Sequence, residues 1–334
     1  ELVIPSLDFH INADWKMISL FQENLTTKLQ GVTLLDQKGN IRDYSKKNIE
    51  YKGFDEEELA LPLPKGGQSA YCLLQEYFAF EKKFNFVTLK NIDLRNFSGR
   101  KLTLKFNFSI LPKKLRTMNR HNLMLNCVPI INLFTKISEP IKLSDKKVDQ
   151  LLIADKKKDS YTEIHSIDSI TVSEPGGSKP KKIRDFSTVT ENQESDEEEN
   201  SNLYWVARRE KSLRKDITGS DIFFSIVERN LSGEIVKNAT AYANLLCTNR
   251  RLCEQIPANS RFDAENISDG IQIKSLYEPT PQRDPSFGGS SIWQLTSLLT
   301  LNHYSLVAGD TGIQQIREML SLFSTGNLRD FEQI

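Results

Sequence analysis

The triplet Asp310-Thr311-Gly312 is the closest match in this sequence to a catalytic motif, that of the aspartic proteases. In those enzymes two such loops bring two aspartates together, and the two carboxyl groups share a proton. Here the triplet occurs once and leads directly into apolar residues at helical spacing. Asp310 or Thr311 is therefore expected to cap a helix. A hydrolase that uses Asp310 is the alternative.

Other catalytic and cofactor motifs are not found. The sequence has no glycine-rich phosphate loop, no Gly-x-Ser-x-Gly and no His-Glu-x-x-His. Its four cysteines, Cys72, Cys127, Cys247 and Cys253, lie among apolar neighbours, which is typical of reduced buried thiols. The spacing of Cys247 and Cys253 is not one that metal ligands usually show. We expect no enzymatic activity, no cofactor and no metal.

Basic residues beside Tyr204 and Trp205 could form a nucleic-acid site, because aromatic rings stack on bases and cations neutralise phosphates. They are Arg208, Arg209, Lys211, Arg214 and Lys215. An acidic run precedes them, however, and the chain has 44 basic and 44 acidic residues. Without a net positive charge to attract phosphates, we expect no nucleic-acid partner.

Composition favours a cytoplasmic globular protein. The sequence pI is about 7.1, and no apolar run approaches the ~18 residues of a membrane span. No cleavable signal pattern opens the chain. We expect association with a membrane only through partners. A length of 334 residues is enough for two or three domains, each with its own core.

Changes in hydrophobic period predict the elements. Apolar residues at helical spacing predict a helix from about Asp14 to Gln30 that stops at Gly31. Strict alternation over residues 101–110 predicts a half-buried strand. Other short strands are expected near residues 128–134, 150–154, 161–172, 203–208, 221–228, 239–246 and 271–276. These favour an α+β, β-rich fold: two β-sandwich or barrel-like domains with peripheral and terminal α-helices.

The predicted domains are residues 1–138, residues 139–290 and a terminal helical segment, 291–334. Within the second domain, residues 174–201 are interpreted as a mobile charged insertion. Its basic patch and its acidic run at 191–199 offer little apolar area to bury, so shortening it should cost little stability. A docking loop for a basic partner is the alternative.

Two features near the end of the chain are expected to connect and cap helices. Residues 279–289, rich in proline and glycine, are typical of a stiff connector that could act as a hinge. Ser291–Gln294 and Thr311–Gln314 both have the form of a capping box before an apolar run.

An aromatic-rich segment from Ser69 to Phe80 predicts a helix with a wide, buried apolar face. Its polar pair, Gln75 and Glu76, must find partners or water. The run from Leu74 to Phe80 resembles the signature of the TssF family, large wedge subunits of the type VI secretion baseplate. Four later segments resemble the same family in the expected order. These are Leu125–Phe134 closing on Glu139-Pro140-Ile141, Leu246–Arg250, Leu276–Pro281 and Trp293–Leu306.

The resemblance, from about Ile49 to Phe323, implies a non-enzymatic scaffold that couples the spike hub to sheath contraction. The implied partners are a second TssF-like copy, a TssG-like wedge subunit, and TssK-like, TssE-like and VgrG-like components. The implied location is the cytoplasm, docked at the inner membrane through the baseplate. It also implies further sequence before Glu1 and after Ile334. A contractile phage-tail-like baseplate protein of another injection system is the alternative.

The resemblance also selects residues. Its motif residues, for which roles in the core are expected, are Leu74, Gln75, Glu76, Tyr77, Phe78, Phe80, Pro129, Asn132, Leu133, Phe134, Thr248, Asn249, Arg250, Asn302, Ser305 and Leu306. Asn132 and Asn249 are expected to satisfy buried backbone groups. Arg250 is expected to pair with a core carboxylate such as Glu76, or else to contact a neighbouring subunit. The candidate interface is the stripe Ile316, Met319, Leu320 and Phe323.

Overall fold

The structure is a computed structural model of the chain. It describes residues 3–64, 67–143, 148–174, 176, 179–188, 203–215, 217–228, 239–265, 270–289, 293, 296 and 310–323. Most of the regular structure is β-strand, with few helices, which confirms the predicted α+β, β-rich class. The chain divides into two compact units, which we call unit 1 (Glu1–Ile131 with Phe323–Ile334) and unit 2 (Asn132–Leu322). The predicted domains 1–138, 139–290 and 291–334 stay a prediction.

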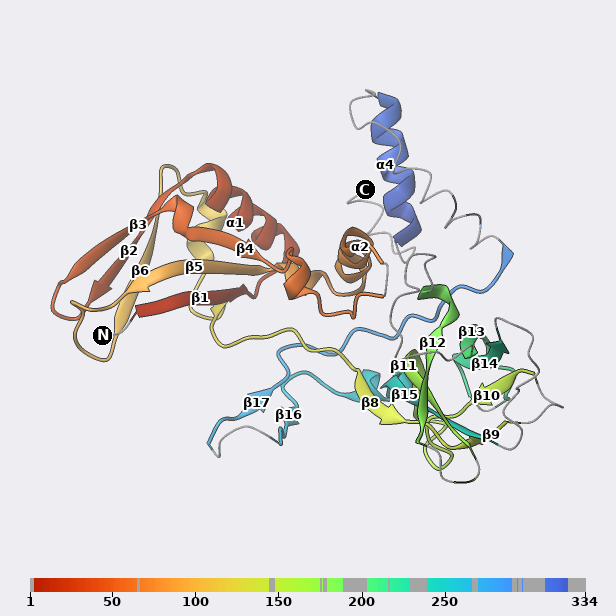
Figure 1. Cartoon of the computed structure of the whole chain (residues 1–334). Helices are drawn as coiled ribbons and strands as arrows, with labels where there is room; N and C mark the ends of the chain where they lie inside the picture. Colours follow the sequence, from red (N-terminus) through yellow and green to blue (C-terminus); the bar gives the residue numbers. More distant parts are fainter. Residues whose placement is uncertain are drawn as a thin grey trace, which may run out of the picture. The chain divides into compact units, whose positions relative to one another are not determined.

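Unit 1 contains two antiparallel sheets (Figure 1). The first has the order β4-β5-β1-β7, and the second has the order β3-β2-β6. The strands of the first are β4 (Ile49–Lys52), β5 (Phe86–Asp93), β1 (Val3–Ile11) and β7 (Leu123–Met124). Those of the second are β3 (Ile41–Ser45), β2 (Leu29–Asp36) and β6 (Leu102–Phe108).

The core of unit 1 unites both sheets with helix α1 (Trp15–Thr27). Phe21 and Leu25 of α1 are buried with Ile11 of β1, Val32 of β2 and Leu89 of β5. The outer face of β6 is exposed and its alternate residues pack on this core, as strict alternation predicts. A sheet needs a covered apolar face, and α1 with the second sheet supplies that cover for the first.

The predicted end of the first helix is wrong. The helix begins as expected, with the Asp14 carboxylate accepting a hydrogen bond from the Met17 amide at 2.9 Å, but it ends at Thr27. Leu29 and Gln30 already belong to β2. A Cβ atom on Gly31 would lie 2.7 Å from the carbonyl oxygen of Tyr44, so this glycine permits close approach of β3 rather than stopping the helix.

Unit 2 is built around one sheet of eight strands, with the order β10-β14-β13-β12-β11-β15-β8 and with β9 also pairing to β15. Every pairing is antiparallel except that of β12 with β13. The strands are β8 (Phe134–Ile137), β9 (Ile141–Lys142), β10 (Gln150–Leu152), β11 (Glu163–Ser173), β12 (Lys181–Asp185), β13 (Leu203–Lys211), β14 (Ser220–Glu228) and β15 (Thr240–Thr248). A separate hairpin joins β16 (Arg261–Phe262) to β17 (Ile273–Lys274).

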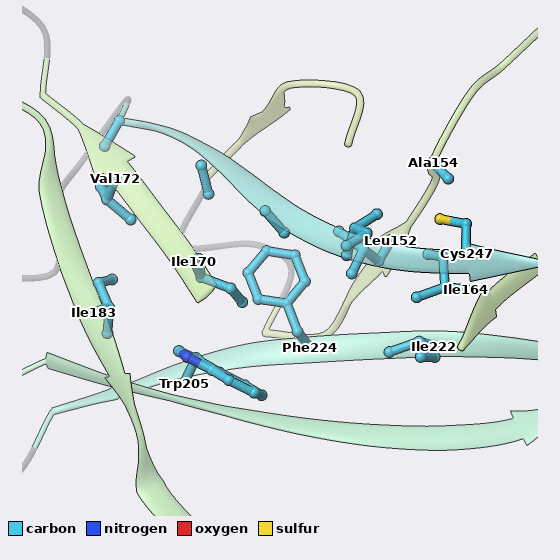
Figure 2. Close-up of a cluster of buried hydrophobic side chains, with 14 residues drawn as sticks. Leu152, Ala154, Ile164, Ile170, Val172, Ile183, Trp205, Ile222, Phe224 and Cys247 are labelled. Carbon is cyan, nitrogen blue, oxygen red and sulfur yellow. The ribbon is translucent and has the colours of Figure 1, made fainter. Parts of the chain in front are cut away.

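The strands of this sheet share one buried cluster (Figure 2). Ile170, Trp205 and Phe224 come from three different strands, and their side chains point toward one another. Leu152 from β10, at one end of the strand order, belongs to the same cluster as Cys247 from β15, near the other end. A sheet whose two ends reach the same core must curl around it, as the barrel-like prediction requires.

Two sequence predictions in unit 2 need correction. The predicted insertion 174–201 is not uniformly a solvated loop, because Lys181–Asp185 forms β12 between β11 and β13, and Ile183 is buried. The acidic run 191–199 lies outside the described residues. The strand expected over 128–134 begins only at Phe134. Pro129, which has no amide hydrogen to donate, disfavours the earlier start.

The last described helix is α4 (Asp310–Phe323). Asp310, Thr311 and Gly312 form its first turn, which agrees with a helix start rather than a protease loop. The side chains of the candidate interface stripe, Ile316, Met319, Leu320 and Phe323, are half-buried. Their role as an interface stays a prediction. Asn302, Ser305 and Leu306 lie outside the described residues, as does the capping box at 291–294 apart from Trp293.

Acid is expected to destabilise unit 1 through His10. This β1 side chain is 3% exposed and its ring centroid lies 4.7 Å from that of Phe86. Burial, with a smaller contribution from the charge of Lys82, lowers the pKa of His10 to about 4 from an ordinary 6.5. The fold thus favours neutral His10, and stability should fall as pH drops from about 6.5 toward 4, by up to about 3 kcal/mol.

Urea unfolding of the wild type and of His10→Gln across this range tests the prediction. The variant should lose less stability than the wild type between pH 6.5 and 4, because glutamine does not titrate. Carboxylates such as Asp93, whose pKa hydrogen bonds from Arg95 depress, are common to both proteins and cancel in the difference. Parallel pH profiles would show that His10 is not responsible.

Candidate functional site

The aromatic motif forms helix α2 (Ser69–Ala79), as predicted, but its burial differs from the prediction. The buried residues of α2 are Cys72 and Glu76, whereas Tyr77 is 39% exposed. Leu74, Phe78 and Phe80 are half-buried, and Gln75 is exposed. The expectation of a wide buried apolar face is therefore wrong, and a carboxylate is the deepest polar group of the motif.

Glu76 is the centre of a buried polar junction, which we call the Glu76 clamp. One carboxylate oxygen accepts hydrogen bonds from the backbone amides of Ala60 at 2.6 Å and Leu61 at 2.5 Å. The other forms an ion pair with Lys83 of the short helix η3 (Glu81–Phe84). Both side chains are at most 3% exposed. The clamp thus fixes the chain before α2 and the turn after it to one point of the helix.

Lys83 extends the clamp to a third segment. Its ammonium group donates to the carbonyl oxygen of Gly53 at 3.1 Å, and the Gly53 amide donates to the Glu58 carboxylate at 2.5 Å. Gly53 has φ +104, in the region that favours glycine, and a Cβ there would lie 3.1 Å from the Lys83 carbonyl oxygen. Glycine is therefore needed for the clamp to close.

A second junction lies in unit 2, and we call it the Glu163 hub. Arg250 and Glu163 form a buried ion pair at 3.3 Å, with side chains 7% and 5% exposed. The sequence paired Arg250 with a carboxylate such as Glu76, so the intrachain alternative is confirmed but the named partner is wrong. The Arg250 guanidinium also donates to the carbonyl oxygens of Thr218 at 2.6 Å and Thr162 at 3.2 Å.

Glu163 accepts hydrogen bonds from two further segments. One oxygen accepts from the amide of Ser220 at 2.7 Å and from its hydroxyl at 2.6 Å. The other accepts from the Gln282 side-chain amide at 2.7 Å. Gly219 has φ +115, and a Cβ on it would lie 2.6 Å from Arg250 Nη1 and 2.7 Å from Glu163 Oε2. The ion pair therefore occupies space that only glycine leaves open.

The Thr248-Asn249-Arg250 segment turns sharply, and Arg250 has φ +48, an unusual value for a side chain other than glycine. The turn is held across the chain by Asn132, whose side-chain oxygen accepts from the Asn249 amide at 3.3 Å and from its side chain at 3.0 Å. Asn132 thus accepts a hydrogen bond from a backbone amide, the kind of contact that was predicted for it. The Asn249 side chain donates to Asn132 and not to a backbone group.

The predicted connector 279–289 is attached to the same place. The backbone amide of Gln282 donates to the Glu254 carboxylate at 2.9 Å, and Asp284 forms an ion pair with Arg251 at 2.8 Å. Glu254 and Arg251 both lie in the short helix η7 (Arg250–Gln255). Residues 282–284 are therefore fixed to the hub, which restricts any hinge in the connector to its remaining residues.

Arg209 of β13 donates hydrogen bonds to residues around the hub. Its guanidinium donates to the Ser220 hydroxyl at 2.5 Å and to the carbonyl oxygens of Ile164 and His165 at 2.8 and 2.6 Å. Burial lowers the pKa of Arg209, and the negative charge of Glu163 opposes that shift. A half-buried cation, Arg209, thus adjoins the buried ion pair, and backbone carbonyl oxygens provide the remaining acceptors.

The basic group proposed for nucleic acid is used within the chain. Arg208 pairs with Asp149 at 2.9 Å and with Glu210, and Arg214 pairs with Asp159 and Asp221. Arg209 is half-buried and donates to backbone carbonyl oxygens. Three of the cations that phosphates would need are therefore already paired with acceptors of this chain.

Neither junction has the arrangement of a catalytic centre in the described residues. The Glu163 and Glu76 carboxylates accept several hydrogen bonds each and lie away from solvent, so they hold segments together. All four cysteines are free, and burial raises the pKa of the Cys247 thiol to about 11, which makes it a poor nucleophile. No group of three or more His, Cys, Asp or Glu side chains in this part of the chain is placed to hold a metal.

Sequence reasoning found Glu76, Asn132, Asn249 and Arg250 but missed their partners. Lys83 and Glu163 lie in ordinary charged stretches, and a charged residue in such a stretch is usually exposed. Gly219 gives a weak signal, because a glycine directly before a strand often marks close approach of another group. Gln282 gave no signal of its own within the proline-rich connector.

The comparison with known families decides the identity. A family described as "Type VI secretion system, TssF" matches residues 1–334. The chain belongs to the TssF family. This confirms the resemblance that the Leu74–Phe80 segment and the four later motifs predicted.

Two similar proteins set the scale of the match. The type VI secretion system component TssF1 of Pseudomonas aeruginosa is 29% identical over 292 residues, which cover 83% of this chain and 46% of that protein. The cryo-electron microscopy structure of a TssK-TssF-TssG baseplate subcomplex contains a chain of similar fold, with a TM-score of 0.74 and 23% identity. That match covers 95% of this chain and 57% of the other. The chain thus spans about half the length of these relatives.

Removing the Gln282 side chain should loosen the connector. Gln282→Ala deletes one hydrogen bond to buried Glu163, and we expect a loss of about 1–2 kcal/mol in the free energy of unfolding of unit 2. Hydrogen exchange should also speed up at residues 282–284 more than in β11 or β15. Gln255→Ala, a glutamine in η7 outside the described hub contacts, is the matched control. Equal exchange in both variants would contradict the attachment.

Proposed function

We propose that this chain acts as a non-enzymatic structural part of a type VI secretion baseplate wedge. The observation that carries the proposal is the TssF family match over residues 1–334. The similar fold of a chain in the TssK-TssF-TssG subcomplex supports it. A structural role needs rigid bodies, and the Glu76 clamp and the Glu163 hub provide rigidity through buried, fully engaged polar groups.

The partners proposed from the family are TssG-like and TssK-like subunits first, with a second TssF-like copy, a TssE-like component and a VgrG-like hub in the same assembly. No helix in the described part of the chain has the length and apolar character needed to cross a membrane. We propose that the protein lies in the cytoplasm and reaches the inner membrane through the baseplate. Its domains would transmit rearrangement of the baseplate to the sheath.

Co-expression with the TssG-like and TssK-like proteins encoded beside it, followed by mass determination of the purified complex, tests this function. A stable complex that contains the TssG-like subunit is expected. A protein that co-purifies with neither neighbour, or that hydrolyses peptides or esters in a manner lost on Asp310→Ala, would contradict the scaffold.

The stripe on α4 supplies a finer test. Leu320→Ala with Phe323→Ala should reduce co-purification with the neighbours if the stripe forms the interface, while the melting temperature stays unchanged. Gln314→Ala with Glu318→Ala, on the exposed side of α4, is the matched control. A large fall in melting temperature would mean instead that the stripe packs within this chain, since buried large-to-small changes cost about 2–5 kcal/mol.

A further inference from the structure

A groove of about 360 Å³ lies on the surface of unit 1. One wall is the side of α1 that faces away from Phe21 and Leu25 of the core. Trp15, Gln22 and Thr26 recur along this wall at helical spacing, with Trp15 44% exposed. The 13 residues of α1 extend for about 20 Å, so the wall is long enough to support several side chains of another helix.

The opposite wall is aromatic. Tyr51, Phe54 and Tyr77 line it and are 36%, 53% and 39% exposed. Phe84, which is buried, forms the floor, with its ring centroid 5.1 Å from that of Phe54 and 5.7 Å from that of Tyr77. Large aromatic side chains grouped in a hollow are the residues that most often anchor a protein partner.

Hydrogen bonds hold this groove in shape. The Tyr51 hydroxyl donates to the carbonyl oxygen of Gln22 at 2.6 Å and lies 2.8 Å from the Thr26 hydroxyl. The Gln22 side chain donates to the carbonyl oxygen of Phe84 at 3.2 Å. Both walls are therefore tied to each other and to the floor, and a partner would lose little free energy in ordering them.

The charged residues that line the groove have one sign. Glu23 and Glu81 line it, and among its described lining residues there is no lysine or arginine. Four cations are adjacent to lining residues in the sequence. Lys16 lies over the Trp15 ring, and Lys52 pairs with Asp8 at 2.7 Å. The charge of Lys82 acts on His10, and Lys83 is buried in the Glu76 clamp.

We propose that this groove, lined by α1, Tyr51, Phe54 and Tyr77, binds a basic amphipathic helix of a partner protein. Its apolar side chains would lie on the exposed rings, as in helix-in-groove recognition. Its lysines or arginines would face Glu23 and Glu81, and could also lie over Tyr77. The inference rests on this surface alone and holds whichever assembly the chain joins.

The test uses the full chain and a labelled synthetic peptide of about 15 residues, with leucine at helical positions i, i+3, i+4 and i+7 and lysine elsewhere. Binding is measured by fluorescence anisotropy. Phe54→Ala and Trp15→Ala should each weaken binding at least tenfold, and Glu23→Lys, which reverses a charge in the groove lining, should weaken it at low salt. Ile110→Ala, a 68% exposed residue of unit 1 outside the groove, should have no effect.

A matched peptide with glutamate in place of lysine is expected to bind at least tenfold more weakly. Circular dichroism of each variant shows that it is folded, and Tyr51→Phe, which removes only the hydroxyl, provides a milder second variant. Equal binding of both peptides, binding unchanged by Phe54→Ala, or no binding at all would overturn the proposal. Self-association of the chain that Phe54→Ala abolishes, without peptide binding, would assign the groove to a second copy and would also overturn it.

Discussion

Arg250→Ala is expected to lower the free energy of unfolding of unit 2 by about 3–5 kcal/mol, the usual effect of breaking a buried ion pair. The variant leaves the Glu163 carboxylate without its cation while both groups stay buried. It also leaves the carbonyl oxygens of Thr162 and Thr218 without their donor.

Urea unfolding followed by hydrogen exchange measures this effect, since exchange separates β11 and β15 of unit 2 from β1 and β5 of unit 1. Arg251→Ala is the matched control, because Arg251 is the next residue along the chain and its side chain pairs with Asp284 on the surface. Such surface pairs contribute about 0–1 kcal/mol. Arg250→Lys should fall between the two, since an ammonium group keeps the charge but loses the planar fork of donors. Equal losses in Arg250→Ala and Arg251→Ala would contradict the hub.

Lys83→Met should destabilise unit 1 by a similar amount, about 3–5 kcal/mol, because methionine fills much of the space but leaves Glu76 buried without its cation. The backbone amides of Ala60 and Leu61 still donate to Glu76, so the carboxylate stays held in the interior. Hydrogen exchange of the backbone amides should speed up most in residues 53–61 and in α2.

The double variant Lys83→Met with Glu76→Gln distinguishes charge from packing. Removing both charges should recover a large part of the loss, since an uncompensated buried charge costs more than the absence of a pair. Lys90→Met, which breaks an exposed pair with Glu50, is the control and should cost less than about 1 kcal/mol. A double variant that is less stable than Lys83→Met would show that the ion pair itself is not the main contribution.

Alternation was the part of the sequence that predicted structure best. The strict alternation of residues 101–110 predicted β6, and the apolar positions of residues 239–246 predicted β15, whose burial alternates along its length. Both strands have one face on a core and one face toward solvent, so their pattern reports their environment directly. The aromatic helix was also found, because its period and the resemblance to the TssF family agreed.

The sequence did worse wherever a tertiary contact decided the outcome. Gly31 looked like a helix stop, yet the carbonyl oxygen of Tyr44 requires a glycine there. Lys181–Asp185 looked like part of a charged loop, yet these residues form β12 between β11 and β13. Its buried apolar residue is Ile183, and a single apolar residue among charged ones is a weak signal for a strand. Glu163 and Gln282 lie far from Arg250 in the sequence, and only the fold brings them together. Lys83 is close to Glu76 in the sequence, but nothing in the local pattern shows that it is buried.

The parallel pairing of β12 with β13 constrains the chain that joins them. Arg184 lies opposite Tyr204 and Asp185 opposite Trp205, so both strands run in the same direction and the start of β13 lies beside the end of β12. A tight hairpin can join only antiparallel strands, and a parallel pair needs a crossover of about a dozen residues or more. The sheet therefore sets a minimum length for the crossover from residue 186 to 202 but leaves its composition free. Natural variants should differ there in charge while rarely falling below that length.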